Sequence, residues 1–181
     1  MSIDLDKASA AYSDFLRAMD IGPENGVDVH EAGRLVSELM ARRMSGMSSL
    51  RPVLTRMASM DHHDPVFVHG LPFYSFCAHH FVPFFGTIDI EYVPDDWMAG
   101  LGGFCRIVEY HARRPQFQEH LTADIADHIM QDLEPRGVRV TIEARQMCME
   151  LQDRGQAVIR TQAVRGQWDF ELRPSVDNGI L

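Results

Sequence analysis

Two stretches of this chain alternate apolar and polar residues in the way that half-buried β-strands do. Residues 87–92 form the first stretch, and residues 138–145 form the second, which a tight turn connects to a return strand over 157–164. A further strand is expected over 66–76. Helical spacing of apolar residues separates the two strand pairs, over 104–112 and 117–133. This order predicts an α+β fold, with helices on one face of an antiparallel sheet.

Two more helices are expected before the sheet, over 5–19 and 28–44, with an irregular segment after them. We therefore divide the chain into an N-terminal part of residues 1–64 and a domain of residues 65–181, which together form a single globular unit. The strands are long and the sheet is small, so its edges would lack partners. Such edges are commonly covered by other subunits, which predicts sheets joined between subunits into a barrel.

The composition narrows the classes of partner. Of the 181 residues, 45% are hydrophobic, and the formal net charge of −9 disfavours nucleic acid and anionic membranes. No apolar run is as long as a membrane span, and the N-terminus lacks the apolar stretch of a signal peptide, so we expect a cytoplasmic protein. The three cysteines are widely spaced and odd in number, which suits reduced thiols or metal ligands better than a disulfide framework.

The segment Cys77-Ala78-His79-His80 is the sharpest candidate for chemistry. Cys77 and His80 have the spacing at which two ligands share one ion, and a thiolate with an imidazole suits zinc. The best third ligand is Cys148, expected on a later strand that reaches the same ion if the two hairpins lie side by side. Three protein ligands would leave one position open, which is typical of catalytic zinc. The other interpretation is a buried cysteine beside two solvent-facing histidines.

Three separated motifs lie in order between about Pro65 and Leu151. The first is the stretch from Phe73 to Gly86. The other two follow in chain order, as Gly100-Leu101 with Arg106-Ile107-Val108-Glu109 and Arg114-Pro115-Gln116-Phe117-Gln118-Glu119-His120-Leu121-Thr122, and then Met147-Cys148-Met149. Together they resemble the GTP cyclohydrolase I family, and the first is similar to the zinc-site signature of that family. The N-terminal helices agree loosely with the family, and the C-terminal tail hardly agrees.

The resemblance implies the tunnelling fold, in which subunits join their sheets into a barrel, rings stack, and sites lie at subunit interfaces. In this family zinc-activated water attacks C8 of the guanine ring of GTP, formate leaves, and the ribose rearranges and recloses to dihydroneopterin triphosphate. Carried over by motif, the zinc ligands are Cys77, His80 and Cys148. His79 matches the histidine that transfers protons beside the metal.

The same resemblance implies the substrate contacts. Gln118 and Glu119 would hold the base, because a carboxylate can accept both a ring N–H and an exocyclic amine of guanine. Arg106 matches a phosphate-contacting arginine. Without the resemblance, the Gln118-Glu119 pair would be interpreted as the solvated start of a helix.

Several positions depart from the family's pattern. Ala78 replaces a glutamate, and Gly102-Gly103 replaces a Ser-Lys pair that contacts ribose and triphosphate. Gln146 replaces the second catalytic histidine, and Gln152 replaces an arginine. We keep Gln146 among the candidate catalytic residues, although an amide cannot act as an acid or base near neutral pH. At least two cations that would face a triphosphate are missing, and each charge-assisted contact is worth about 1.5–3 kcal/mol.

The leading hypothesis is a zinc-dependent cyclohydrolase, a divergent member of the family, that opens the imidazole ring of a guanine-like or other purine-derived heterocycle lacking the triphosphate. One alternative is a true GTP cyclohydrolase I, and another is a purine- or pterin-binding homologue without turnover. A third, a nitrile reductase, needs a metal-free cysteine nucleophile, and only Cys105 is available, in a helix where we expect it to be buried. We expect a small-molecule purine- or pterin-like substrate, a zinc cofactor and a ring-shaped homo-oligomer.

Overall fold

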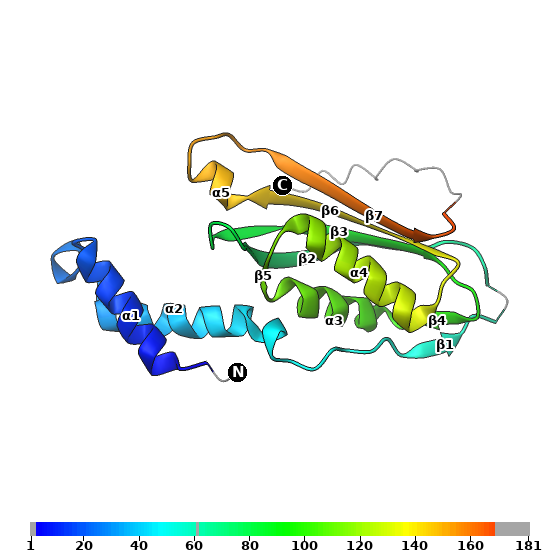
Figure 1. Cartoon of the computed structure of the whole chain (residues 1–181), viewed down its shortest axis with the longest axis horizontal. Coiled ribbons are helices and arrows are strands. Elements are labelled where there is room, and N and C mark those ends of the chain that lie inside the picture. The colour runs from blue at the N-terminus through cyan, green and yellow to red at the C-terminus, as the bar shows by residue number, and fades with distance from the viewer. Residues whose placement is uncertain (1–2, 61, 169–181) are drawn as a thin grey trace.

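The structure is a computed structural model that describes residues 3–60 and 62–168, and it contains the expected sheet (Figure 1). Five strands lie in the order β5-β2-β3-β6-β7, and every neighbouring pair is antiparallel except β2 and β5. Their bounds are β2 Val66–Cys77, β3 Pro83–Val93, β5 Pro115–Gln116, β6 Gly137–Gln146 and β7 Val158–Gly166. The predicted α+β fold class is confirmed.

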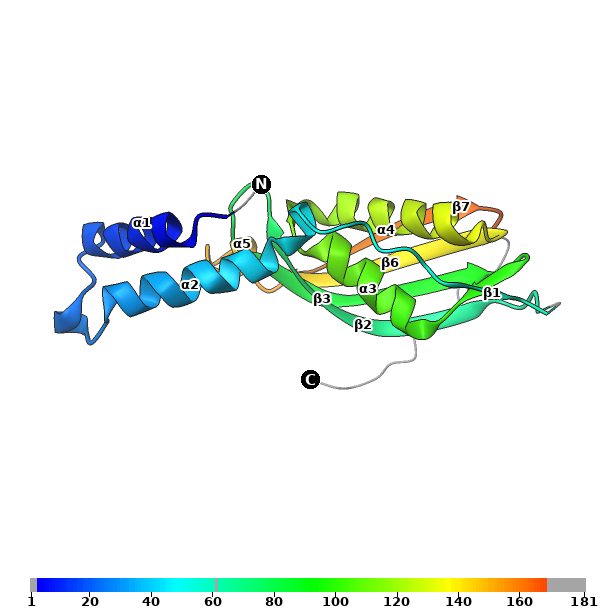
Figure 2. The same ribbon diagram turned by 90° about the horizontal axis from the view of Figure 1, so that it is seen from below.

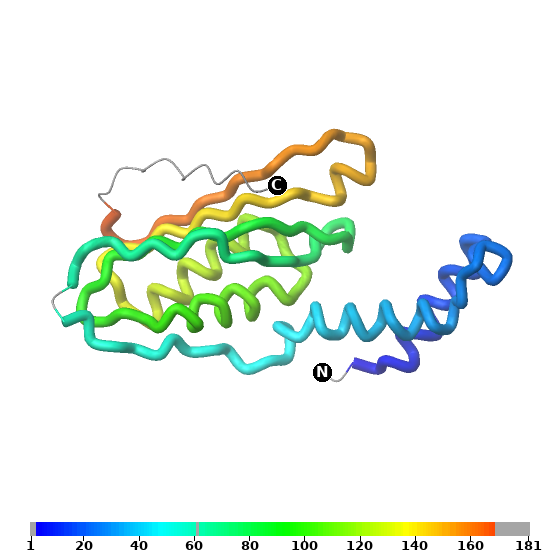
Figure 3. The backbone as a smooth tube through the Cα atoms, turned by 180° about the vertical axis from the view of Figure 1, so that it is seen from behind, coloured from blue at the N-terminus to red at the C-terminus, as the bar shows by residue number. Residues whose placement is uncertain are grey.

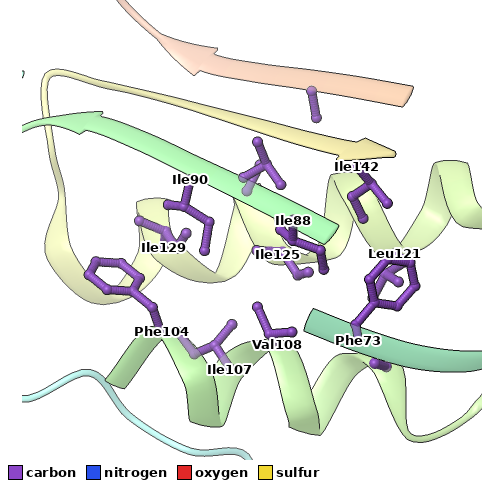
Figure 4. Packing of buried hydrophobic residues seen from close by; sticks show 14 of the residues in the cluster. Phe73, Ile88, Ile90, Phe104, Ile107, Val108, Leu121, Ile125, Ile129 and Ile142 are labelled. Carbon is purple, nitrogen blue, oxygen red and sulfur yellow. The ribbon is translucent and has the colours of Figure 1, made fainter. Parts of the chain in front are cut away.

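Helices α3 (Leu101–Ala112) and α4 (Gln118–Leu133) cover one face of this sheet, as Figure 2 shows. Because alternate side chains of a strand point to opposite faces, Ile88, Ile90 and Ile142 all face the helices. Figure 4 shows them packed with Phe104, Ile107, Val108, Leu121, Ile125 and Ile129. Burying each such side chain contributes about 1.5–3 kcal/mol, so this shared core fixes both helices on the sheet.

The opposite face of the sheet is polar, yet part of it is buried. Arg139 on β6 donates to the carboxylate of Glu91, its partner in the register on β3, and both residues are less than 9% exposed. The Arg139 guanidinium also lies 4.8 Å from the centroid of the Trp168 ring. Removing either partner of the pair would leave a buried charge without compensation, so the pair favours this register of β3 and β6.

Helices α1 (Leu5–Ala18) and α2 (Val29–Arg43) form a hairpin that extends away from the sheet, with η1 (Pro23–Asn25) between them (Figures 1 and 3). The Asp4 and Asp28 side chains cap their N-termini. The two helices pack closely where Gly33 faces Ser13, since a Cβ on Gly33 would lie 2.5 Å from Ser13 Oγ. Both helices begin and end within one residue of the predicted bounds.

Much of the apolar surface of this hairpin is exposed, although Leu16 and Val29 are buried. Phe15 and Met19 of α1 are 55% and 58% exposed, and Leu35 and Leu39 of α2 are 49% and 43% exposed. Small and polar residues such as Ser13, Gly33 and Ser37 are buried in the hairpin, whereas these four larger apolar side chains remain exposed. A set of large exposed apolar side chains on one hairpin suits a surface that another protein covers.

The segment after α2 is less irregular than predicted. It contains η2 (Ser45–Met47) and a short strand β1 (Arg56–Ala58), which pairs with β4 (Trp97–Ala99). Leu54 in this segment is 2% exposed and belongs to the core. The division of the chain at residue 64 stays a prediction. Among the described residues, no helix has the length and apolar character needed to cross a membrane.

Candidate metal centre

The candidate metal centre begins at the turn between β2 and β3. Cys77 N–H donates to the Val82 carbonyl, and Phe81 N–H donates to the Cys77 carbonyl, both at 2.9 Å. Phe81 has a left-handed φ of 54°, which reverses the chain into β3. The turn therefore brings His80 back to Cys77, with His80 Nδ1 3.8 Å from Cys77 Sγ.

The third candidate ligand follows the end of β6. Gln146, the last residue of β6, pairs with Phe84 near the start of β3. The short helix α5 (Met147–Glu150) follows at once and carries Cys148, so the expectation that Cys148 lies on a strand is wrong. Leu151 N–H closes this single turn by donating to the Met147 carbonyl at 2.9 Å. Figure 1 shows α5 and the β2–β3 turn at the same end of the sheet.

The ligand atoms of Cys77, His80 and Cys148 all lie within 4.8 Å of one another. Tetrahedral zinc places its sulfur and nitrogen ligands roughly 3.5–3.8 Å apart, which the Cys77–His80 pair already matches. Two thiolates and an imidazole are a donor set that zinc prefers, and three protein ligands leave one position open. Within residues 3–60 and 62–168, no other group of His, Cys, Asp and Glu side chains meets the same criterion.

The two thiols are close enough to influence each other. Burial raises the pKa of the Cys148 thiol, and the charge and hydrogen bond of Cys77 raise this pKa further. The Cys148 thiolate is therefore disfavoured without a cation. A divalent ion held by this thiol would supply the positive charge that favours loss of its proton, which is the condition for a thiolate ligand.

His79 lies beside this centre and is exposed. Its ring centroid is 4.2 Å from that of His80, with an angle of 47° between the ring planes. The imidazole is thus accessible to solvent next to a candidate ligand. Its role in proton transfer stays a prediction.

Gln118, at the start of α4, is only 4% exposed, and the protein itself uses its amide. Its Nε2 donates to the carbonyls of Ile142 at 3.1 Å and Ile159 at 2.9 Å, and its Oε1 accepts from Gln146 Nε2 at 2.7 Å. These bonds tie the start of α4 to β6 and β7. They also connect it to Gln146, which directly precedes the α5 segment that carries Cys148. A contact between Gln118 and substrate stays a prediction.

The two charged candidates for substrate binding are both exposed. Glu119 follows Gln118 in the first turn of α4, and Arg106 lies near the middle of α3. Neither makes a side-chain ion pair or hydrogen bond within the described part of the chain. Their charges therefore remain available for a ligand, although no contact joins Arg106 to the candidate metal ligands within one chain.

Cys105 is exposed on α3, so the expectation of a buried thiol is wrong. It lines an open cavity of about 240 Å³ between α3 and β2, together with Arg43, Leu71, Tyr74, Glu109 and Arg113. None of the predicted site residues lines this cavity. It lies beside the portion of β2 that has no strand partner on its outer side.

One residue next to the metal centre escaped the sequence-based selection. Gln116 of β5 pairs in parallel with Cys77, and its carbonyl accepts from the Ala78 N–H at 3.1 Å. It belongs to the second motif quoted above, but a glutamine within a loop-like Pro-Gln-Phe segment carries no signal of burial. Only the fold reveals that it is 6% exposed and adjacent to a candidate ligand.

Comparison with known proteins shows to which family the chain is related. The family model for GTP cyclohydrolase I matches residues 8–178. The chain is 38% identical over 174 residues to GTP cyclohydrolase 1 of Brevibacillus brevis, covering 93% of this chain and 92% of the relative. It is 39% identical over 153 residues to that of Streptococcus pyogenes serotype M49, covering 83% and 78%, and 38% identical over 170 residues to that of Thermobifida fusca, covering 91% and 81%.

Among solved structures, the archaeosine synthase QueF-Like in the apo form aligns with a TM-score of 0.47 and 17% identity, over 59% of this chain and 96% of that one. The match to the family model spans nearly the whole chain, and it includes the β2–β3 turn, both sheet-covering helices and α5. With its helices on one face of an antiparallel sheet, as expected of a tunnelling-fold subunit, the chain belongs to the GTP cyclohydrolase I family.

Proposed function

We propose that the protein is a zinc-dependent cyclohydrolase that opens the imidazole ring of a guanine-like or other purine-derived heterocycle lacking a triphosphate. The observation that carries this proposal is the convergence of Cys77, His80 and Cys148 within 4.8 Å, from two hairpins that are far apart in sequence. Such a set holds an ion with one position left for water or substrate. Family membership supports the class of reaction.

Cys77, His80 and Cys148 would hold the zinc ion, which supplies Lewis-acid activation of water when bound. His79 is the residue that moves protons in this proposal, taking one from the attacking water and returning one to the departing ring nitrogen. An imidazole ring can accept a proton at one nitrogen and donate one, so it can do both. The exposure of His79 beside His80 is consistent with this role.

Glu119 binds the base in this proposal, since its free carboxylate accepts two N–H groups from one edge of a guanine-like ring. Gln118 directs Glu119 by fixing the start of α4, through its bonds to the Ile142 and Ile159 carbonyls. Gln146 completes this arrangement by donating to Gln118 Oε1. The amide of Gln146 thus has a clear hydrogen-bonding role without any need for proton transfer.

The preference for a substrate without a triphosphate follows from missing charge. Gly102 and Gly103 carry no side chain, and Gln152 is neutral, at positions where the family has charged or hydroxyl contacts. Arg106 remains, and one guanidinium is enough for a single anionic group. Losing two charge-assisted contacts of about 1.5–3 kcal/mol each would weaken triphosphate binding by orders of magnitude.

Two other functions each have an observation in their favour. The relatives that match over most of the chain are named GTP cyclohydrolase 1, which favours GTP itself as substrate. The replacement of a proton-transferring histidine by Gln146 favours a purine or pterin binder without turnover. Both alternatives use the same candidate site residues, so the reaction products distinguish them.

We further propose a ring-shaped homo-oligomer in the cytoplasm, with sites built between subunits. In the described sheet, β7 has no strand partner on its outer edge. The outer edge of β2 is also unpaired, except at the two residues that pair with β5. Such unpaired edges favour pairing with another copy of the chain. The exposed apolar side chains of α1 and α2 would be covered in the same assembly. Arg106 would then act on the site of a neighbouring subunit. Reduced thiol ligands suit the cytoplasm.

The experiment that tests the proposed activity is incubation of the zinc-loaded protein with GTP, guanosine, guanine, urate and pterins, followed by mass spectrometry. Addition of water or loss of formate from a substrate without a triphosphate would support the proposal. Efficient conversion of GTP to dihydroneopterin triphosphate would favour the first alternative. Binding of a purine or pterin without any change of mass would favour the second.

A further inference from the structure

Gln116 occupies the place where helix α3, strand β2 and the metal-binding turn meet. It lies in the two-residue strand β5, which connects α3 to α4 and pairs in parallel with the last two residues of β2 (Figure 1). Its partner in the register is Cys77. Its carbonyl accepts from the N–H of Ala78, the first residue of the turn that continues to His80. The backbone of Gln116 therefore holds one side of that turn.

The side chain of Gln116 connects β5 to strand β2 and to helix α3. Its Nε2 donates to Ser75 Oγ at 3.1 Å and to the His111 carbonyl at 2.6 Å. Ser75 Oγ donates in turn to the Arg114 carbonyl at 3.1 Å. Ser75 is 1% exposed and Gln116 is 6% exposed, so water does not compete for these bonds. One amide thus links the strand before Cys77 to the last turn of α3.

The last turn of α3 is itself fixed from the opposite side. His111 Nε2 lies 2.7 Å from His128 Nδ1 on α4, and His128 Nε2 lies 2.9 Å from the Pro52 carbonyl. A carbonyl only accepts, so the proton of His128 is assigned to Nε2, and Nδ1 accepts from His111 Nε2–H. His111, whose carbonyl binds the Gln116 side chain, is therefore anchored to α4 and to the segment before β1.

We propose that Gln116 is a positioning residue of the metal centre, which keeps Cys77 and the turn to His80 at ligand distance from Cys148. This inference rests on the proposed metal site. Cys77 and His80 belong to one short turn, whereas Cys148 comes from another hairpin, so their separation depends on how firmly each is held. Partners beyond the ligands themselves typically change metal affinity by about 10- to 100-fold.

The test replaces the amide by an apolar side chain of similar length, Gln116→Met, and measures zinc affinity by competition with a chromophoric chelator. Gln162→Met on β7 is the control, because Gln162 donates to Thr141 Oγ1 outside this network. We expect the zinc dissociation constant to rise at least about tenfold in Gln116→Met and to stay unchanged in the control. Cobalt(II) replaces zinc in a second measurement, and its absorption bands should shift in Gln116→Met, because they report ligand geometry rather than stability.

A second pair of variants keeps the test decisive if Gln116→Met does not fold. Ser75→Ala removes one partner of Gln116, and Ser13→Ala is the matched control, a serine of equal 1% exposure that donates to the Val29 carbonyl. We expect zinc binding to weaken by about threefold to tenfold in Ser75→Ala alone. Equal zinc affinity and unchanged cobalt spectra in folded Gln116→Met or Ser75→Ala would overturn the inference while the proposed metal site stands. Failure of the unmodified protein to bind zinc would overturn both.

Discussion

His111 and His128 lie against each other between α3 and α4, with His111 Nε2 2.7 Å from His128 Nδ1 and the rings nearly perpendicular, at 80°. Burial, together with the neighbouring His128 and the arginines at 114 and 51, lowers the pKa of His111 to about 3. Burial also lowers the pKa of His128, against the opposing effect of Asp132. Both imidazoles are therefore neutral in the folded protein at neutral pH.

This pair predicts a loss of stability in acid. The unfolded chain takes up a proton on each histidine below about pH 6.5, whereas folded His111 does so only near pH 3. The free energy of unfolding should therefore fall by about 1.4 kcal/mol per pH unit from His111 alone, between about pH 6 and pH 3. Urea denaturation at a series of pH values measures this slope. The double variant His111→Phe with His128→Leu should have a shallower slope, and exposed His63→Gln should have the original one.

Metal content should depend on two of the three cysteines. We expect about one zinc per chain in the unmodified protein and in Cys105→Ala, because Cys105 lies on α3 outside the candidate centre. Cys77→Ala and Cys148→Ala should lose the ion, because two ligands hold zinc far more weakly than three. Elemental analysis after dialysis checks this. Full occupancy in either of the latter variants would contradict the assignment.

Glu119→Ala should abolish binding or turnover of the heterocycle and leave zinc content and assembly unchanged. The carboxylate is exposed and free in the described chain, so its removal leaves no buried group without a partner. A surface glutamate with no ligand would change affinity by no more than about 0.5 kcal/mol. Calorimetric titration with the substrate found by mass spectrometry separates the two cases. Glu109→Ala on α3 serves as a control at an exposed glutamate that pairs with Arg113.

Gln152→Arg should improve the use of triphosphates. The residue is exposed just after α5, where an added guanidinium needs no repacking. One charge-assisted contact of about 1.5–3 kcal/mol predicts a rise in kcat/KM for GTP, relative to guanosine, of at least about tenfold. Gln156→Arg, in the same exposed loop, adds the same charge elsewhere and should leave the ratio unchanged. If the unmodified protein already converts GTP with kcat/KM of about 10⁴ M⁻¹s⁻¹ or more, other cations replace the missing ones and the triphosphate is still bound.

The protein should be a large oligomer in solution. Light scattering at micromolar concentration should give a mass several times the 20.6 kDa of one chain, because exposed apolar helices and unpaired strand edges are costly in a monomer. Leu35→Glu on α2 should reduce that mass or destabilise the assembly. A monomeric mass for the unmodified protein would exclude sites shared between subunits.

The sequence was sufficient for features that repeat along the chain or lie within a few residues of one another. The alternation around Ile88 and Ile90 specifies a half-buried strand, and the spacing of Cys77 and His80 specifies a possible ligand pair. Helix α5 escaped prediction because a single turn has no periodicity. The exposure of Cys105 escaped it because a cysteine on a helix gives no indication of which side faces solvent.

Cys148 apart, the contacts between distant segments were beyond the reach of the sequence. His111 and His128 belong to different helices, and Gln116 gains its partners only when β5 lies beside β2. Nothing in the local pattern of either segment specifies these pairs. The same holds for Gln118, which has the composition of an exposed helix start and is buried because β7 brings the Ile159 carbonyl to it.

The origin of the candidate ligands in two hairpins has a consequence for how the protein matures. Residues 77 and 80 leave the ribosome well before residue 148, so the nascent chain presents an incomplete chelator until β6 has paired with β3. An ion that then joins the hairpins closes a loop of roughly seventy residues, and a covalent cross-link of that span is worth about 4 kcal/mol through the unfolded state. Acquisition of metal is therefore expected to be a late event that locks a sheet already formed, and chelation should accelerate unfolding more than it slows refolding.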